Sequence, residues 1–283
     1  MKFMKNFLTS QIKSNDISVL LLLYKTSKSV LKNLENYKDF KVYILDQSND
    51  HQLKKKVIKI LPKIQLYKIT NENRGFAWGI NFLTKKIKTR FFLCTQADVV
   101  ISKKSILRLK KPFLIKKDTI ISIPLIKNFK NFNSANNKVD KLVKVNKMIG
   151  AIFLSEKDKF NKIGKFDENF FFYWEDMDLS KRIENSKYTL YLNPMSKANH
   201  LGGQSTTQEY RNLFIKNLNF KFGEYLYQYK YNELRIVKIS RELIKIPILS
   251  LFCFITLQFK SSFKMFCYYL GILKFINFII LNK

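Results

Sequence analysis

Residues 17–23 form a nearly unbroken apolar run, Ile-Ser-Val-Leu-Leu-Leu-Leu. A strand without alternating polar side chains is buried on both faces, as happens in parallel sheets that are covered by helices. Residues 29–37 then carry apolar side chains at helical spacing, and residues 41–45 return to strand character before Asp46. The chain therefore starts with a strand–helix–strand unit whose two strands are expected to lie parallel.

The same alternation continues along the chain. We predict helices at residues 52–61 and 76–87, and strands at residues 64–69 and 90–94. This order predicts an α/β fold with a mostly parallel central sheet flanked by helices. Ligands of such sheets bind beyond the carboxyl ends of the strands.

Polar residues follow three of the predicted strands. Asp46 ends the second strand, residues 71–75 follow the third, and Asp98 follows the fourth. Because the carboxyl ends of parallel strands meet at one edge of a sheet, we expect these residues to line one crevice.

The next part of the chain is less regular. Residues 127–146 are rich in Asn and Lys and predict a loop, and residues 148–154 predict another strand. Residues 175–185 predict a helix with an acidic first turn, where carboxylates complement the exposed amide groups of the helix start.

The composition is that of a folded, strongly basic protein. Hydrophobic residues make up 46% of the chain, which excludes an intrinsically disordered class. The chain has 52 Lys and Arg against 21 Asp and Glu, and an excess of +31 suggests nucleic acid, anionic lipid or a phosphorylated ligand. The Lys residues are spread along the whole chain, as a compositionally biased genome would also produce. Without a localised basic stripe or a known binding motif, we expect no nucleic-acid partner.

Cysteine usage and the amino terminus both favour the cytoplasm. Cys94, Cys253 and Cys267 are an odd, scattered set without the spacing of a metal site, which fits a reducing interior. Residues 1–15 are basic but lack an apolar core long enough for a signal peptide.

The last part of the chain changes character. Glu242 is its only acidic residue, and apolar runs fill residues 246–259 and 265–281. Each run falls short of the ~20 apolar residues of a clean membrane span. We therefore expect a main domain at residues 1–235 and a helical tail at 236–283 that lies on, or dips into, the cytoplasmic face of a membrane. A helical cap on the main domain, a dimer interface and a two-helix span are the alternatives.

Three features are candidates for chemistry. Asp98 supplies a hard oxygen ligand at a strand end, where Mg or Mn could bridge two phosphates, although such residues also serve as turn or helix caps. His200 is one of two histidines and is predicted in a loop, either as a ligand or as a surface residue. Residues 170–176, Phe-Phe-Phe-Tyr-Trp-Glu-Asp, lead from aromatics into two carboxylates. These aromatics could raise the proton affinity of a general base, or form a core cluster before an acidic helix start.

A series of short motifs runs in order from residue 17 to residue 206. The most specific are Phe-Asp-Glu at residues 166–168 and Glu-Asp-Met-Asp-Leu at residues 175–179. The series resembles the family 2 inverting glycosyltransferases of the GT-A fold, especially the bacterial rhamnosyltransferases and galactofuranosyltransferases that build surface polysaccharides. The other matching segments are Leu-Asp-Gln-Ser-Asn-Asp at 45–50, Asn-Glu-Asn-Arg-Gly-Phe-Ala at 71–77 with Asn81, Thr-Gln-Ala-Asp at 95–98, Met-Ile-Gly-Ala at 148–151 and His-Leu-Gly-Gly-Gln-Ser-Thr at 200–206.

The resemblance implies a site for a nucleotide-sugar donor. Asp46 would hydrogen-bond the donor base, and Asn73 and Gly75 would line the nucleoside pocket. Gln96 would also face the donor, at a position where many relatives carry an acidic residue or Asn. Its amide offers a carbonyl oxygen but contributes no charge.

The resemblance also implies a metal and a base. Asp98 would hold a divalent cation, Mg or Mn, with His200 as a further ligand. Asp176 would be the general base, Glu175 would contact the acceptor or orient the site, and Trp174 would form part of the acceptor wall.

The implied reaction is the inverting transfer of a rhamnose-like or similar sugar from a nucleotide-diphosphate donor to a glycan or polyprenyl-linked acceptor. A single in-line displacement inverts the anomeric carbon and requires no second carboxylate nucleophile. A catalytically silent glycosyltransferase-like scaffold is the alternative that Gln96 suggests. The oligomeric state is left open.

Overall fold

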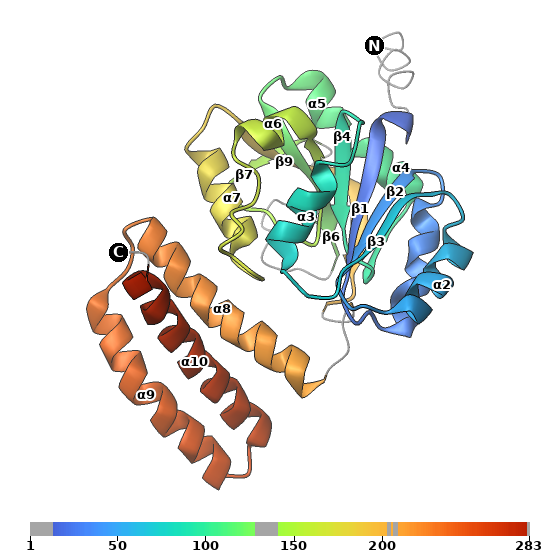
Figure 1. Cartoon of the computed structure of the whole chain (residues 1–283). Helices are drawn as coiled ribbons and strands as arrows, with labels where there is room; N and C mark the ends of the chain where they lie inside the picture. The colour runs from blue at the N-terminus through green and yellow to red at the C-terminus, as the bar shows by residue number, and fades with distance from the viewer. Residues whose placement is uncertain (1–13, 128–140, 203–204, 206–208, 282–283) are drawn as a thin grey trace. The chain divides into compact units, whose positions relative to one another are not determined.

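The computed structural model describes residues 14–127, 141–202, 205 and 209–281, and its described strands form one nine-stranded sheet (Figure 1). The contacts of the chain divide it into two units. The α/β unit comprises residues 1–167 and 176–207, and the helical unit comprises residues 168–175 and 208–283.

The first half of the sheet is parallel, as the sequence predicts. Its strands lie in the order β3-β2-β1-β4, and each neighbouring pair is parallel. Their bounds are β1 Ile17–Leu23, β2 Lys41–Asp46, β3 Ile64–Ile69 and β4 Phe91–Thr95.

The second half of the sheet is mixed. There β8 is antiparallel to both β4 and β6, β6 is parallel to β9, and β5 and β7 pair antiparallel with β9. The predicted loop at 127–146 contains β7 in its described part, whereas residues 128–140 lie outside the described residues. The bounds are β5 Val99–Ile101, β6 Thr119–Ile126, β7 Val143–Val145, β8 Ile152–Glu156 and β9 Thr189–His200.

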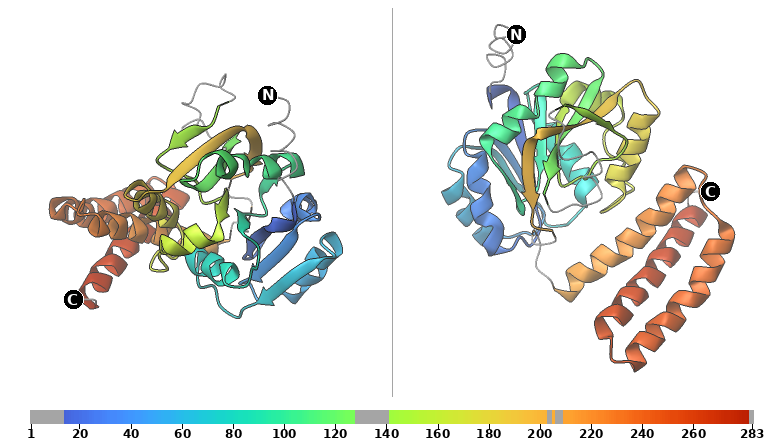
Figure 2. Two further views of the ribbon diagram at one scale, coloured as in Figure 1. Left: turned by 90° about the horizontal axis from the view of Figure 1, so that it is seen from above. Right: turned by 180° about the vertical axis from the view of Figure 1, so that it is seen from behind.

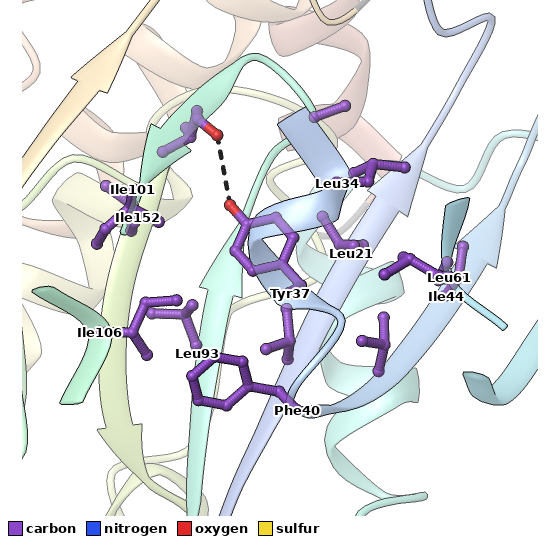
Figure 3. Packing of buried hydrophobic residues seen from close by; sticks show 14 of the residues in the cluster. Leu21, Leu34, Tyr37, Phe40, Ile44, Leu61, Leu93, Ile101, Ile106 and Ile152 are labelled. Atoms are coloured by element: carbon purple, nitrogen blue, oxygen red, sulfur yellow. Dashed lines mark hydrogen bonds between the residues drawn. The ribbon is translucent and has the colours of Figure 1, made fainter. Parts of the chain in front are cut away.

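Successive side chains of β1 point to opposite faces of the sheet, and both sets are mostly apolar. Helices therefore cover both faces. Leu21 belongs to the apolar cluster that includes Leu34 and Tyr37 of η2, and Figure 3 shows these side chains together. On the other face, a Cβ added to Gly79 of α3 would lie 2.5 Å from Leu22, so glycine permits this close approach. The bounds are η1 Ser14–Asp16, η2 Lys28–Tyr37, α2 His51–Ile60, α3 Phe76–Thr84, α4 Lys103–Arg108, α5 Lys111–Ile115, α6 Lys157–Lys162 and α7 Glu175–Glu184.

The helical unit contains α8 (Tyr210–Lys230), α9 (Ile236–Ile255) and α10 (Phe259–Leu281). Helix α10 packs against both α8 and α9, as the rear view in Figure 2 shows. The two apolar runs predicted as tail helices therefore lie in helices. The boundary predicted at residue 236 falls inside this unit, because α8 shares its apolar core with α10.

A partly buried ion cluster links α8 to α9 within the helical unit. Lys221 lies 2.9 Å from Glu224 and 2.6 Å from Glu242, and Lys238 lies 2.6 Å from Glu224. The hydroxyl of Tyr225 donates to Glu242 over 2.9 Å. Burial alone would raise the pKa of Glu224, but the hydrogen bonds from Lys238 and Lys221 outweigh burial and hold this pKa below its ordinary range. Glu242, the only acidic residue of the predicted tail, thus links α9 to α8 through Lys221 and Tyr225.

Candidate active site

Asp46 is the last residue of β2, and its side chain is fully buried. Its Oδ1 accepts hydrogen bonds from the backbone N–H and the hydroxyl of Ser48, and its Oδ2 accepts from the Tyr67 hydroxyl at 3.0 Å. Burial raises the pKa of the Asp46 carboxyl, although the bonds from Ser48 and Tyr67 oppose that rise. The carboxylate is therefore fixed in one orientation at the edge of the sheet.

The loop before α3 is joined to the end of β2 by Gln47. The side chain of Gln47 donates to the Gly75 carbonyl at 3.1 Å and accepts from the Arg74 N–H at 2.8 Å. The Asn73 side chain accepts from the Gly75 N–H at 3.0 Å, and Gly75 has a φ of 89°, which favours glycine. The structure thus places Asp46, Asn73 and Gly75 close together, where the end of β2 meets the loop before α3. The role of Gln47 was missed, although it lies beside Asp46 in a motif that the sequence singles out.

Side chains of η2 hold the end of β4 and the turn at residues 96–98 that follows it. The Tyr37 hydroxyl lies 2.9 Å from the Thr95 hydroxyl, a contact drawn in Figure 3, and Asn33 donates to the Ala97 carbonyl at 3.0 Å. Between them, Gln96 is partly buried, and its backbone carbonyl accepts from the Val99 N–H at 3.2 Å. Asn33 and Tyr37 therefore position this turn. The spacing of apolar residues predicts the helix but not that these two side chains contact the turn.

Asp98 and His200 lie side by side. The Nε2 of His200 is 3.5 Å from Oδ2 of Asp98, and the Asp98 side chain is fully buried. His200 is the last residue of β9 rather than part of a loop, because its backbone pairs with Val99 of β5. The Ser205 N–H also donates to Oδ2 of Asp98, at 3.2 Å.

This pair suits a divalent cation as a partial ligand set. A carboxylate oxygen and an imidazole nitrogen are both metal ligands, and they already lie close enough to share one ion. No group of three or more His, Cys, Asp or Glu side chains suited to a metal occurs among the described residues. Phosphate oxygens and water would therefore have to complete the coordination, as is usual for Mg²⁺ at nucleotide sites.

Asp176 is the second residue of α7. Its Oδ2 accepts from the Gly150 N–H at 2.9 Å and its Oδ1 from the Met177 N–H at 2.8 Å. Burial raises the pKa of the Asp176 carboxyl, against these two hydrogen bonds, which lower it. A carboxylate with raised proton affinity is suited to accept a proton.

Gly150 connects Asp176 to the same edge of the sheet as Asp98. Gly150 comes two residues before Ile152, which pairs with Thr95 at the end of β4, and Cys94 of β4 lies 3.9 Å from the Gly150 carbonyl. Because β1 lies between β2 and β4 and is parallel to both, the ends carrying Asp46 and Asp98 share one edge. All three carboxylates therefore belong to the carboxyl edge of the parallel half-sheet.

Arg182 joins the two most specific motifs. It pairs with the buried carboxylate of Asp178 at 2.8 Å and donates to the carbonyls of Ile163 and Lys165, each at 2.6 Å. Asp178 and Arg182 thus hold α7 against the turn that precedes the Phe-Asp-Glu motif. The second Asp of the Glu-Asp-Met-Asp-Leu motif, Asp178, therefore has a structural role as the partner of Arg182.

Replacing Arg182 by Ala should destabilise the α/β unit strongly. The substitution leaves the Asp178 carboxylate buried without its charged partner, which costs about 3–5 kcal/mol. Urea unfolding measures this loss, with Lys181→Ala as the control because Lys181 pairs with Glu184 at 3.2 Å near the surface. Equal unfolding midpoints for the two variants would contradict a stabilising role of the Arg182–Asp178 pair.

Glu175 and Trp174 group with the helical unit rather than with Asp176. Trp174 packs on Phe220 and Tyr227 of α8, with ring centroids 6.0 Å and 5.4 Å away. Glu175 is the buried first residue of α7. Trp174, which the resemblance implies as part of the acceptor wall, therefore packs on α8 within the helical unit.

The sequence profile described as glycosyl transferase family 2 matches residues 20–182, which include Asp46, Asp98 and Asp176. The chain belongs to glycosyl transferase family 2. No curated protein matches this family 2 chain in sequence.

Solved structures similar to this family 2 chain share its fold at low identity. GalNAc-T7 with UDP, GalNAc and Mn²⁺ has a TM-score of 0.55 at 15% identity, over 73% of this chain and 47% of that chain. The mannosyltransferase PcManGT from Pyrobaculum calidifontis, with GDP-Man and Mn²⁺, has a TM-score of 0.57 at 13% identity, over 78% and 69%. S. aureus TarS has a TM-score of 0.54 at 13% identity, over 83% and 48%. The chain spans about half the length of the first of these, and the GT-A fold predicted from sequence is confirmed.

Proposed function

We propose that this family 2 chain transfers a sugar from a nucleotide-diphosphate donor to an acceptor hydroxyl with inversion. The observation that carries the proposal is the position of Asp176. It is a carboxylate of raised pKa, tied through Gly150 to the strand end that leads to the Asp98–His200 pair. A base and a candidate diphosphate-binding pair thus belong to one sheet edge.

In the proposed mechanism each group has one task. Asp46 and the loop at residues 73–75 bind the nucleoside, and Gln96 lies beside the diphosphate. Asp176 accepts the proton of the acceptor hydroxyl as its oxygen attacks the anomeric carbon, and the nucleoside diphosphate leaves from the opposite side. One displacement inverts the centre, and no covalent sugar–enzyme bond is needed.

Asp98 and His200 would hold the divalent cation. Mg or Mn, when bound, offsets the negative charge that develops on the leaving diphosphate. The proposal of a cation is supported by the 3.5 Å carboxylate–imidazole pair and by the Mn²⁺ present in two of the similar structures.

For the donor, the motif resemblance favours a rhamnose-like or galactofuranose-like sugar, used in building a cell-surface polysaccharide. The two similar structures that hold UDP and GDP-Man support a nucleotide-linked donor of some kind. Calorimetry with dTDP-rhamnose, UDP-galactofuranose, UDP-hexoses and GDP-mannose, with and without Mn or Mg, tests this. Binding of none of them would favour a silent scaffold and contradict the proposal.

We also propose that the helical unit attaches the chain to the cytoplasmic face of a membrane, where a polyprenyl-linked or other lipid-linked glycan would be the acceptor. By length and composition, helix α10 could cross a membrane. Its most apolar stretch of 18 residues has a mean hydropathy of 1.5, and 22% of that stretch is buried. Leu251, Phe254 and Leu257 are 60%, 57% and 73% exposed. Exposed apolar patches of this kind mark surfaces that bind a membrane or a partner, and nearby Lys260 and Lys264 suit anionic lipid headgroups.

Charging that surface should abolish membrane binding. The double variant Leu251→Glu and Phe254→Glu is expected to lose at least ~90% of sedimentation with anionic vesicles, because two charges would enter the acyl region at a cost of several kcal/mol. The control is Ile58→Glu in α2, an apolar residue 43% exposed in the α/β unit. If the double variant sediments like wild type, the tail serves another partner.

A further inference from the structure

The segment that leads into Glu175 and Asp176 has an unusual backbone. Tyr173 and Trp174 have φ values of 70° and 73°, a region that aromatic residues rarely adopt. Two such residues in succession persist only when their surroundings hold them. Within the described part of the chain, moreover, the buried Nε1 of Trp174 has no hydrogen-bond partner. The turn is therefore not held by hydrogen bonds of the indole.

Both aromatic side chains of the turn pack on α8. The Tyr173 ring lies 5.5 Å from the Phe220 ring, and the Trp174 ring lies 6.0 Å from the Phe220 ring and 5.4 Å from the Tyr227 ring. Phe220 and Tyr227 are seven residues apart on α8, so they lie on one face of the helix. Gly223 lies between them in sequence.

Gly223 is the point of closest approach. A Cβ at this position would lie 2.9 Å from Cδ1 of Trp174, 3.2 Å from the Tyr173 carbonyl oxygen and 3.3 Å from Cβ of Trp174. One of these atoms belongs to the backbone of the strained turn, so a rotamer change of Trp174 cannot relieve the whole clash. Any residue larger than glycine would push the turn away from α8.

We propose that Gly223 is a positioning residue for catalysis: by omitting a side chain, it lets α8 fix the Tyr173–Trp174 turn and thereby Glu175, the residue that follows this turn and belongs to the same unit. This inference rests on the proposed transfer reaction and on the role expected for Glu175, which is to contact the acceptor or orient the site. Helix propensity alone would favour alanine at position 223, because alanine is more stable than glycine in a helix interior. The contact with the turn explains why glycine stands here in a buried stretch of α8.

The test uses the full-length Gly223→Ala variant, with transfer rate, donor affinity and indole fluorescence measured. We expect kcat to fall roughly 10- to 100-fold, as displacements near 1 Å can cause. The donor affinity should be unchanged, because Asp46 and the 73–75 loop lie in the α/β unit. In a Trp78→Phe background, which leaves Trp174 as the single tryptophan, the emission maximum should shift.

Gly271→Ala is the matched control. Its Cβ would meet the Leu218 carbonyl at 2.6 Å and Cβ of Lys221 at 2.9 Å, so it strains the contact of α10 with α8 away from the turn. We expect this variant to lower the melting temperature without shifting the Trp174 emission. A merely structural role of Gly223 predicts the same behaviour for both variants, and that result would overturn the inference.

The remaining outcomes separate the inference from the proposed function. If wild type is active and Gly223→Ala keeps its kcat, the inference alone fails. If wild type transfers no sugar from any donor, the proposed function fails and the inference fails with it.

Discussion

The Asp176→Asn variant should bind the nucleotide sugar normally and transfer it at least ~100-fold more slowly, since general bases contribute about 10²–10⁴-fold. The amide is isosteric with the carboxylate and keeps an oxygen for the Gly150 N–H, but it loses the bond that the second carboxylate oxygen accepts from the Met177 N–H. We therefore expect a modest loss of stability with the start of α7 still in place. Transfer rates under saturating donor and calorimetric donor affinities measure the two effects. The control is Asp158→Asn, an exposed aspartate in the first turn of α6.

The pH dependence gives the same experiment a second readout. Burial raises the pKa of Asp176 above the ordinary 3.8, so protonation removes the base at a higher pH than for a free aspartate. In wild type, kcat/KM should therefore fall on the acid side as the pH drops through this raised value. The residual rate of the Asn variant should lack this acid limb. Substantial turnover with an unchanged limb would assign the base to another residue.

Asp98→Ala is expected to remove metal-dependent donor binding and to lower transfer by at least ~100-fold. A cation on the leaving diphosphate contributes several kcal/mol, and each ~1.4 kcal/mol is a factor of ten in rate. Removing the carboxylate leaves only His200 of the ligand pair. Calorimetry of the donor with and without Mn, compared for wild type and variant, measures the binding loss directly.

Two controls sharpen the Asp98 result. Asp39→Ala removes an exposed carboxylate that pairs with Lys103 at 2.9 Å, and it should leave donor binding intact. His200→Ala should weaken the metal dependence less than Asp98→Ala, because it removes a neutral ligand rather than a charged one. Donor binding by Asp98→Ala that still responds to Mn would place the cation elsewhere.

The parallel half-sheet could be predicted from sequence because its signal is local. The apolar run at residues 17–23 shows burial on both faces, and the spacing in residues 29–37 shows a helix, although η2 is a 3₁₀-helix. Asp46 and Asp98 could be placed at strand ends for the same reason, since a strand that stops at a carboxylate is visible in the sequence. Family membership followed from the order of the motifs along the chain.

Only the tertiary structure decided which distant residues meet. The family resemblance implies that Asp98 and His200 share a metal, but the β5–β9 ladder is what brings the two residues together. The link of Asp176 to β4, which no motif implies, passes through the backbone of Gly150. The assignment of α8 to the helical unit depends on side chains of α8 and α10 that share a core. Periodicity reports which face of an element is buried but not what covers that face, so these long-range contacts had to come from the folded chain.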